Sequence, residues 1–111
     1  MTNGADTALR LADAKIRAIC TGGELLAESM AYVGAAAADM VRNYSFDAVF
    51  FSAAGFDDGV ISDWSESETV FRRILLRHGK KRYFLADRSK QGKRFAHIIG
   101  PISDVDDVIC G

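Results

Sequence analysis

The sequence predicts an α/β fold with a mostly parallel sheet and helices on both of its faces. Short apolar stretches typical of strands alternate along the chain with stretches of helical periodicity. Strands joined through helices run parallel, because a parallel pair requires a crossover connection. The chain has 111 residues, of which 49% are hydrophobic. That is enough for one modest core, so a single domain over residues 1–111 is expected.

The first third of the chain predicts helix, strand and helix. Residues 5–14 place alanines and leucines on one helical side, which indicates an amphipathic helix. Residues 15–20 alternate as a strand does, and the glycines of 21–23 end it, because glycine releases the backbone. A short extended piece at 31–34 leads into a helix over 35–42 that is built from strong helix formers.

The middle of the chain predicts the centre of the sheet and its longest helix. Residues 47–53 lack polar alternation, which indicates a strand buried on both faces. Gly55 and Gly59 bracket an acidic loop. The spacing Ser65-x-x-Glu68 is a capping box that opens a helix, and Gly79 is expected to close it. The inner face of that helix is expected to carry four apolar residues, Val70, Phe71, Ile74 and Leu75.

The last third predicts strands with little between them. Residues 82–86 form the next strand, residues 98–101 follow, and a last short strand covers 105–110. The order of elements therefore alternates until the C-terminal part, where two strands follow each other.

Charge and cysteine usage exclude several classes of function. Ten of the fourteen basic residues lie between Arg72 and Arg94, although the net charge is only −1. Such a cluster could hold a nucleic-acid backbone or a small phosphorylated ligand, or it is a solvated helix face and loop. The chain carries no nucleic-acid-binding motif, no signal sequence and no apolar run that could cross a bilayer, so a cytoplasmic, soluble protein is expected. Cys20 and Cys110 lack metal-ligand spacing and are expected to be buried thiols, so neither a metal nor a cofactor is expected.

Three loops that follow strands define the candidate site. The loops at residues 21–23, 53–55 and 87–90 are expected to meet at the carboxyl edge of the sheet, where α/β proteins bind ligands. Gly22 and Gly23 let backbone N–H groups approach an oxyanion, or form a plain turn. Lys90 offers a point charge for a phosphate, and Asp87 could orient it or accept a hydroxyl proton; a surface pair would look the same.

Asp57 binds hydroxyls or caps its turn, as aspartates commonly do. No Gly-rich nucleotide motif is present. His78 and His97 lack a serine or cysteine partner, so no catalytic residue is expected.

Several blocks together resemble the effector-sensing domain of DeoR-type bacterial transcriptional repressors. They are Phe50–Asp57, Gly59–Ser62, the Glu68 helix, Leu85–Gly92 and Asp104–Asp106, with Thr2-Asn3 matching a Thr-Asn block of the family. The resemblance implies a fold similar to ribose-5-phosphate isomerases and CoA transferases and a phosphorylated sugar as effector. It implies a ligand site made of Lys90, Asp87, Gly22, Gly23, Asp57, Gly55 and Asn3. A homo-oligomer is expected because the family segments missing before Thr2-Asn3 would leave a sheet edge or helix face uncovered.

Two departures from the family pattern bear on function. Ala54 stands where the family usually has an aspartate, and an alanine can neither take nor give a proton. The family also places a DNA-binding helix-turn-helix, and the first strand and helix of the sensor, before the Thr2-Asn3 block. A truncated sensor that reaches DNA only through that absent domain is therefore expected. Two alternatives remain open: an isomerase-like enzyme, and a dimerisation or interaction module without a ligand.

Overall fold

The computed structural model describes residues 1–111, with three α-helices and eight strands. The contacts between residues divide the chain into two compact units, Met1–Asn43 and Tyr44–Gly111. No helix has the length and apolar character that crossing a membrane requires.

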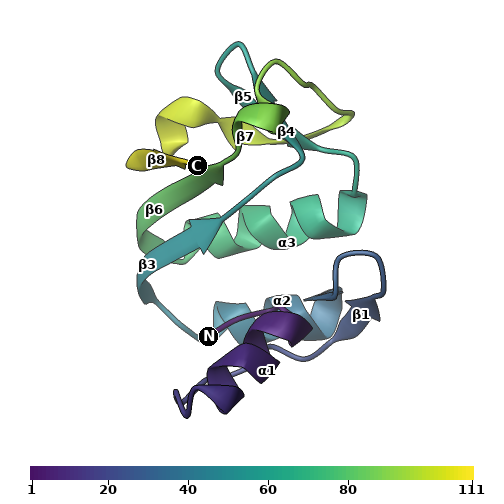
Figure 1. Cartoon of the computed structure of the whole chain (residues 1–111), viewed down its shortest axis with the longest axis vertical. Coiled ribbons are helices and arrows are strands. Elements are labelled where there is room, and N and C mark those ends of the chain that lie inside the picture. Colours follow the sequence, from purple (N-terminus) through teal and green to yellow (C-terminus); the bar gives the residue numbers. More distant parts are fainter. The chain divides into compact units, whose positions relative to one another are not determined.

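The first unit contains two helices and a small antiparallel sheet (Figure 1). Helix α1 (Ala5–Asp13) is followed by β1 (Glu24–Leu26) and β2 (Ala31–Val33), which pair antiparallel. Helix α2 (Ala35–Arg42) is the helix that the sequence predicts over 35–42. Its alanines allow close packing, and it buries three side chains, Ala37, Ala38 and Val41.

The strand predicted over residues 15–20 is wrong in this unit. Only Cys20 makes a strand-like pairing, a parallel bridge to Thr2. Lys15 has a φ of 57°, in the left-handed region, so the backbone turns where the strand was expected to begin. Alternation of apolar and polar residues did not suffice, because this segment has no neighbouring strand to pair with along its length.

The second unit contains two three-stranded sheets and one α-helix. The parallel sheet has the order β3–β6–β8, made of β3 (Phe46–Phe51), β6 (Gly79–Ala86) and β8 (Asp107–Cys110). The antiparallel sheet has the order β4–β5–β7, made of β4 (Gly55–Asp57), β5 (Val60–Asp63) and β7 (His97–Pro101). The α/β class and the parallel sheet are confirmed, whereas the antiparallel sheet was not expected.

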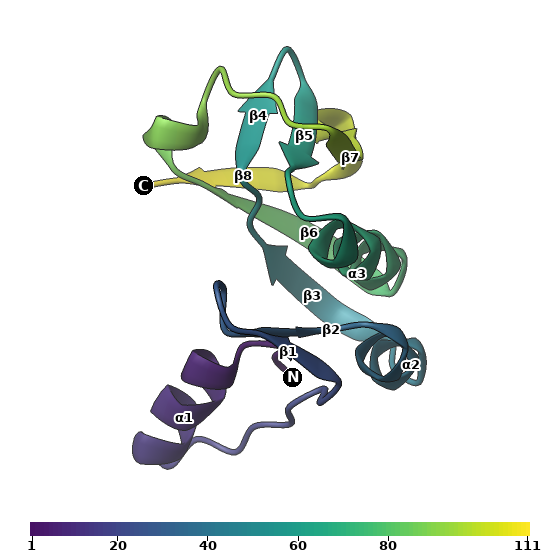
Figure 2. The same cartoon turned by 90° about the vertical axis from the view of Figure 1, so that its right-hand side faces the viewer.

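Helix α3 (Glu66–Arg77) contacts β3 and β6 of the parallel sheet and lies along one side of these strands (Figure 2). Two short 3-10 helices, η1 (Arg88–Lys90) and η2 (Ile102–Asp104), complete the unit. The core lies where the two sheets meet and is formed by Phe51, Ala53, Ile61, Phe84, Ala86 and Ile99. Phe84 is fully buried and contacts aromatic rings from both sheets, Phe51 and Phe56.

The central strand of the parallel sheet is β6 rather than residues 47–53. β3 pairs only with β6, and its side chains alternate between buried and exposed, so Val49 and Phe51 are buried while Phe50 is 58% exposed. The expectation of a strand buried on both faces is wrong because Phe50 stacks on Tyr83 of β6, which makes an apolar side chain stable on an otherwise open face.

Of the predictions made for α3, the Ser65 cap is confirmed, the inner face is confirmed in part, and the Gly79 cap is wrong. Ser65 caps the helix by accepting a hydrogen bond from the Glu68 backbone N–H at 3.4 Å. Phe71 and Ile74 are buried, but Val70 is exposed and lies off the inner face. Gly79 begins β6 instead of capping the helix, and a Cβ on Gly79 would lie 2.6 Å from a methyl group of Val49. Close strand packing therefore explains this glycine.

Both cysteines are free and exposed, contrary to the expectation of buried thiols. Cys20 lies in the irregular segment that follows α1, and Cys110 ends β8, an edge strand of the parallel sheet.

Candidate functional site

The candidate site of the second unit lies where the strands of the parallel sheet end. β3 and β6 pair in parallel register, with Phe51 beside Phe84. The loops that follow these strands therefore leave the sheet at the same edge, which is where open α/β sheets bind ligands. The loop after β6, Asp87–Lys93, carries two of the seven predicted site residues, Asp87 and Lys90.

Asp87 organises this loop. Its Oδ1 accepts a hydrogen bond from the Ser89 backbone N–H at 3.1 Å, and its carbonyl accepts one from the Lys90 N–H at 2.9 Å. The N–H and hydroxyl of Ser89 lower the pKa of the Asp87 carboxyl below its ordinary value of 3.8, with the charges of Lys90 and Lys93 adding to the effect. Asp87 is therefore an ionised cap that fixes the turn carrying Lys90.

The cations of this loop are largely uncompensated. Asp87 is the sole acidic residue from 87 to 94, against four basic ones, Arg88, Lys90, Lys93 and Arg94. None of these four takes part in the ion pairs of the chain. Lys90 is half-buried, whereas the other three are exposed. Arg94 is held in place, because its Nη2 donates to the carbonyl of Asp57 at 3.1 Å.

Strand β4 lies beside this loop. Phe56 forms a parallel bridge with Gln91, and its carbonyl accepts a hydrogen bond from the Gly92 N–H at 2.9 Å. A Cβ on Gly55 would lie 2.4 Å from the Lys93 carbonyl oxygen, so Gly55 is required for this approach. Asp57 is half-buried at the end of β4. The structure thus brings four predicted residues into adjoining segments: Asp87, Lys90, Gly55 and Asp57.

The other three predicted residues belong to the first unit. Asn3 donates from Nδ2 to the carbonyl of Tyr32 at 3.0 Å, so its amide is engaged inside the unit. Gly22 has a φ of 65° with no atom near the position of a Cβ, which leaves its backbone open. A Cβ on Gly23 would lie 2.7 Å from the Val33 carbonyl oxygen. Whether these residues share a site with Lys90 stays a prediction.

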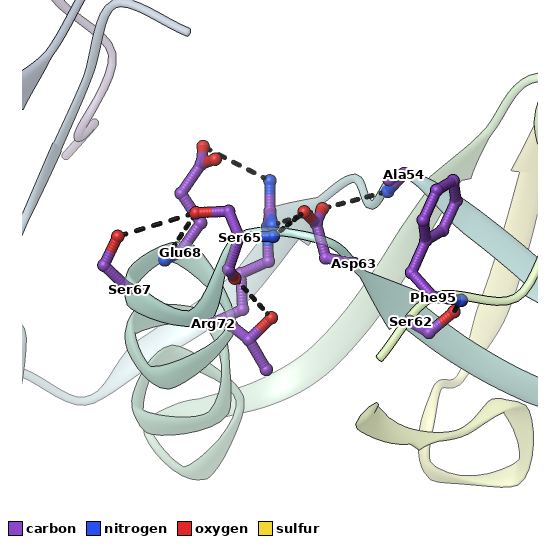
Figure 3. A network of polar contacts seen from close by, with 9 residues as sticks. Ala54, Ser62, Asp63, Ser65, Ser67, Glu68, Arg72 and Phe95 are labelled. Atoms are coloured by element: carbon purple, nitrogen blue, oxygen red, sulfur yellow. Dashed lines mark hydrogen bonds and ion pairs between the residues drawn. The ribbon is translucent and has the colours of Figure 1, made fainter. Parts of the chain in front are cut away.

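A buried polar network next to the β3–β4 loop was missed by sequence reasoning (Figure 3). Asp63, at the end of β5, is 3% exposed. Its Oδ2 accepts from the Ala54 N–H at 3.0 Å and from Arg72 Nη1 at 2.9 Å, and its Oδ1 accepts from the Ser65 N–H at 2.9 Å. The carboxylate thereby fixes the loop after β3 to the start of α3.

Glu68 belongs to the same network. Its Oε1 lies 3.7 Å from Arg72 Nη2, so Arg72 is placed between two carboxylates. The sequence contains a signal for this arrangement: an aspartate at the end of an apolar strand, two residues before a helix cap, and an arginine one turn after Glu68. All the buried side-chain nitrogen and oxygen atoms of the chain are hydrogen-bonded.

Groups of three or more His, Cys, Asp or Glu side chains with metal-binding geometry are not found in the structure. The two histidines are accounted for differently. The His78 ring makes a hydrogen bond at 3.0 Å through Nδ1 with the Tyr44 carbonyl, and His97 pairs with Asp63 as a strand neighbour.

The second unit is therefore an α/β arrangement with a parallel sheet and a basic loop at the carboxyl edge of that sheet. The family model of the DeoR C terminal sensor domain matches residues 1–111. The chain therefore belongs to the family of DeoR C-terminal sensor domains, as its resemblance predicts.

Curated relatives are bacterial transcriptional regulators. The chain is 31% identical to the uncharacterized HTH-type transcriptional regulator YulB of Bacillus subtilis, over 98% of this chain and 43% of that protein. It is 34% identical to the lactose phosphotransferase system repressor of Staphylococcus epidermidis, over 69% of this chain and 31% of the repressor. It is 28% identical to the glycerol-3-phosphate regulon repressor of Escherichia coli, over 83% of this chain and 37% of the repressor. The chain spans less than half the length of these relatives.

Proposed function

We propose that this chain is the effector-binding domain of a DeoR-type transcriptional regulator and that its effector is a phosphorylated sugar or a related phosphorylated metabolite. The observation that carries the proposal is the set of unpaired cations on the Asp87–Lys93 loop at the carboxyl edge of the parallel sheet. A dianionic phosphate supplies the charge that this loop lacks.

Each part of the loop has a role in this proposal. Lys90, half-buried on the turn that Asp87 caps, contributes the ammonium group that pairs with the phosphate. Asp57 and Asp87 are acceptors for sugar hydroxyl groups, since ionised carboxylates accept strong hydrogen bonds. Gly55 allows the two segments to approach each other. Asn3, Gly22 and Gly23 of the first unit are proposed as further ligand-binding residues, and no atom lies near the position of a Cβ on Gly22.

The proposed regulation is a population shift. An effector that binds one arrangement of the regulator more tightly than another changes the affinity of an attached DNA-binding domain. The names of two relatives agree with a role in carbohydrate metabolism, since they refer to a lactose phosphotransferase system and a glycerol-3-phosphate regulon. We propose a homo-oligomeric, cytoplasmic regulator in which residues 1–111 form a single sensor domain, and in which a helix-turn-helix outside these residues binds DNA.

We infer a binding rather than a catalytic role. Ala54 offers only its backbone, and its N–H already donates to Asp63. Asp63 in turn has its two oxygens occupied by three donors, so it is not a free base. An isomerase-like enzyme would need an acid or a base in this loop. The enzyme alternative predicts turnover of a sugar phosphate, whereas the binding proposal predicts none.

The experiment is a thermal-shift screen with phosphorylated hexoses and pentoses, glycerol 3-phosphate and inorganic phosphate, each organic compound paired with its unphosphorylated form. A ligand at about 100 times its Kd stabilises the native state by about 2.7 kcal/mol, which raises Tm by about 10 °C. The shift should vanish in Lys90→Ala and persist in Lys80→Ala, a control at the other end of β6. No shift with any phosphate, or equal shifts with the unphosphorylated forms, would overturn the proposal.

A further inference from the structure

The last two residues of β5, Ser62 and Asp63, are polar although they are only 0% and 3% exposed. The strand begins with two apolar residues, Val60 and Ile61, so the polar pair interrupts an apolar pattern. A buried hydroxyl or carboxylate costs free energy unless it is hydrogen-bonded. The partners of these two side chains therefore indicate what the pair does.

The Ser62 hydroxyl holds the segment that follows the Asp87–Lys93 loop. Its Oγ accepts a hydrogen bond from the Phe95 N–H at 2.9 Å. Residues 92–96 belong to neither a helix nor a strand, so this bond takes the place of a strand pairing. Since the Gly92 N–H donates to β4, the segment is held on β4 at one end and on β5 at the other.

The backbone that carries Lys90 is thereby fixed on both sides. The Asp87 cap holds the turn before it, and the bonds of Gly92 and Phe95 hold the chain after it. These contacts leave the ammonium group of Lys90 without an ion pair. A binding group on a fixed backbone has less ordering left to lose when a ligand arrives, so such contacts raise affinity without touching the ligand.

Asp63 holds the second loop of the candidate site. Its Oδ2 accepts from the Ala54 N–H at 3.0 Å, directly before Gly55. Figure 3 shows both contacts, Asp63 with Ala54 and Ser62 with Phe95. Two consecutive residues of one strand therefore fix two loops that are far apart in the sequence.

The strand pairing is irregular at the same place. Ile61 pairs with Gly100 of β7, whereas Ser62 pairs with Ile98, so the register shifts between Ile61 and Ser62. Such irregularities bend a strand and re-aim its side chains, and they are common next to active sites. The bend is a second observation, independent of the hydrogen bonds, that sets the end of β5 apart from a regular strand.

We propose that Ser62 and Asp63 are positioning residues of the effector site, which hold the Asp87–Lys93 loop and the loop after β3 in the arrangement that binds phosphate. Both side chains are buried, so they act through the loops and not by contact with the effector. This inference rests on the proposed effector function and adds to it the residues that give the two loops their geometry.

The test compares Ser62→Ala with the wild type by amide chemical-shift titration of the full chain with glycerol 3-phosphate and with inorganic phosphate. The dissociation constant should rise about tenfold, the lower end of what losing a supporting hydrogen bond costs at metal sites. Without ligand, the Phe95 amide should exchange with solvent about tenfold faster, because its acceptor is gone. Asp63→Asn should also weaken binding; Ser62→Ala alone decides if circular dichroism shows that the asparagine impairs folding.

Gly79→Ala is the matched control, because it strains the same unit at the amino end of β6, where neither loop lies. It should bind both compounds as the wild type does, at a temperature where every variant is folded. An equal loss of affinity in this control, an unchanged dissociation constant in Ser62→Ala, or an unchanged exchange rate of Phe95 would overturn the positioning role alone. A wild type that binds neither compound would instead overturn the effector function, and the positioning role with it.

Discussion

Replacing Asp63 by asparagine should destabilise the second unit strongly, although the two side chains have almost the same shape. All three partners of the carboxylate are donors: the N–H groups of Ala54 and Ser65 and the guanidinium of Arg72. An asparagine keeps one acceptor oxygen, but its NH2 group then faces a donor and cannot be satisfied. Arg72 also loses its closest counter-charge.

The magnitude follows from the burial of the network. Removing one partner of a buried ion pair costs about 3–5 kcal/mol, and a single unsatisfied buried donor about 1–3 kcal/mol. The Arg72 side chain is 16% exposed and keeps Glu68 at 3.7 Å, so the lower end applies, at about 3 kcal/mol. With a urea m-value of about 1.5 kcal/mol/M, the unfolding midpoint falls by about 2 M.

Urea unfolding followed by circular dichroism measures this loss, with Asp47→Asn as the matched control. Asp47 also pairs with a cation, Lys80, at 3.8 Å, but its side chain is 99% exposed. An exposed pair contributes little, so the control should keep the midpoint of the wild type. If Asp63→Asn unfolded at the same urea concentration as the control, the network would not hold the loop after β3, and the reasoning would be refuted.

Three further predictions concern packing, titration and thiol exposure. Gly79→Ala should lower the unfolding free energy by about 2 kcal/mol, because the new Cβ meets β3 methyl groups at 2.6 and 2.8 Å; Gly100→Ala, with no atom nearer than 3.5 Å, should be neutral in the same urea assay. The pKa of the Asp87 carboxyl, measured by NMR, should lie below 3.8 and should rise in Ser89→Ala. The stabilisation that this carboxylate contributes is present above pH 3.8 and is lost as the pH falls through its lowered pKa. An unshifted pKa would contradict this prediction. A thiol reagent should modify two residues in the native protein, Cys20 and Cys110, and reaction only in denaturant would contradict the exposed positions.

The sequence predicted those elements whose signals are local. α2 and α3 begin and end close to their expected bounds, because alanine-rich composition and a serine cap act within a few residues. The β4–β5 hairpin was overlooked although its signal is present. Asp58-Gly59, with φ of 49° and 73°, is the two-residue turn typical of hairpins, and the segment was taken for an acidic loop.

Strand placement within the sheet could not be predicted from the same signals. The apolar run at residues 47–53 looks like a central strand, yet β6 occupies the centre while two lysines and an arginine lie within it. The lysine side chains of β6 lie near its amino end and are exposed, so they do not prevent pairing on both sides. Which strands are neighbours depends on long-range pairing, and no short window of sequence encodes that.

In the candidate site, too, the residues with a local sequence signal could be predicted and those brought together by long-range contacts could not. Asp87 and Lys90 could be found because a strand runs directly into a polar loop, and Gly55 because its block matches the family. Asp63 and Arg72 were not assigned a role because they are nine residues apart and on different elements. Their contact depends on the turn between β5 and α3, where Ser65 places Asp63 against the first turns of the helix.

Amide chemical-shift mapping tests the central claim most directly, since it reports both binding and its location. The labelled chain is titrated with the phosphorylated sugar that gives the largest thermal shift, or with inorganic phosphate if none does. The account predicts saturable shifts that concentrate on residues 87–93 and 55–57 and disappear in Lys90→Ala. Saturable shifts confined to other parts of the chain, or none with any phosphate, would contradict a phosphorylated effector at this loop.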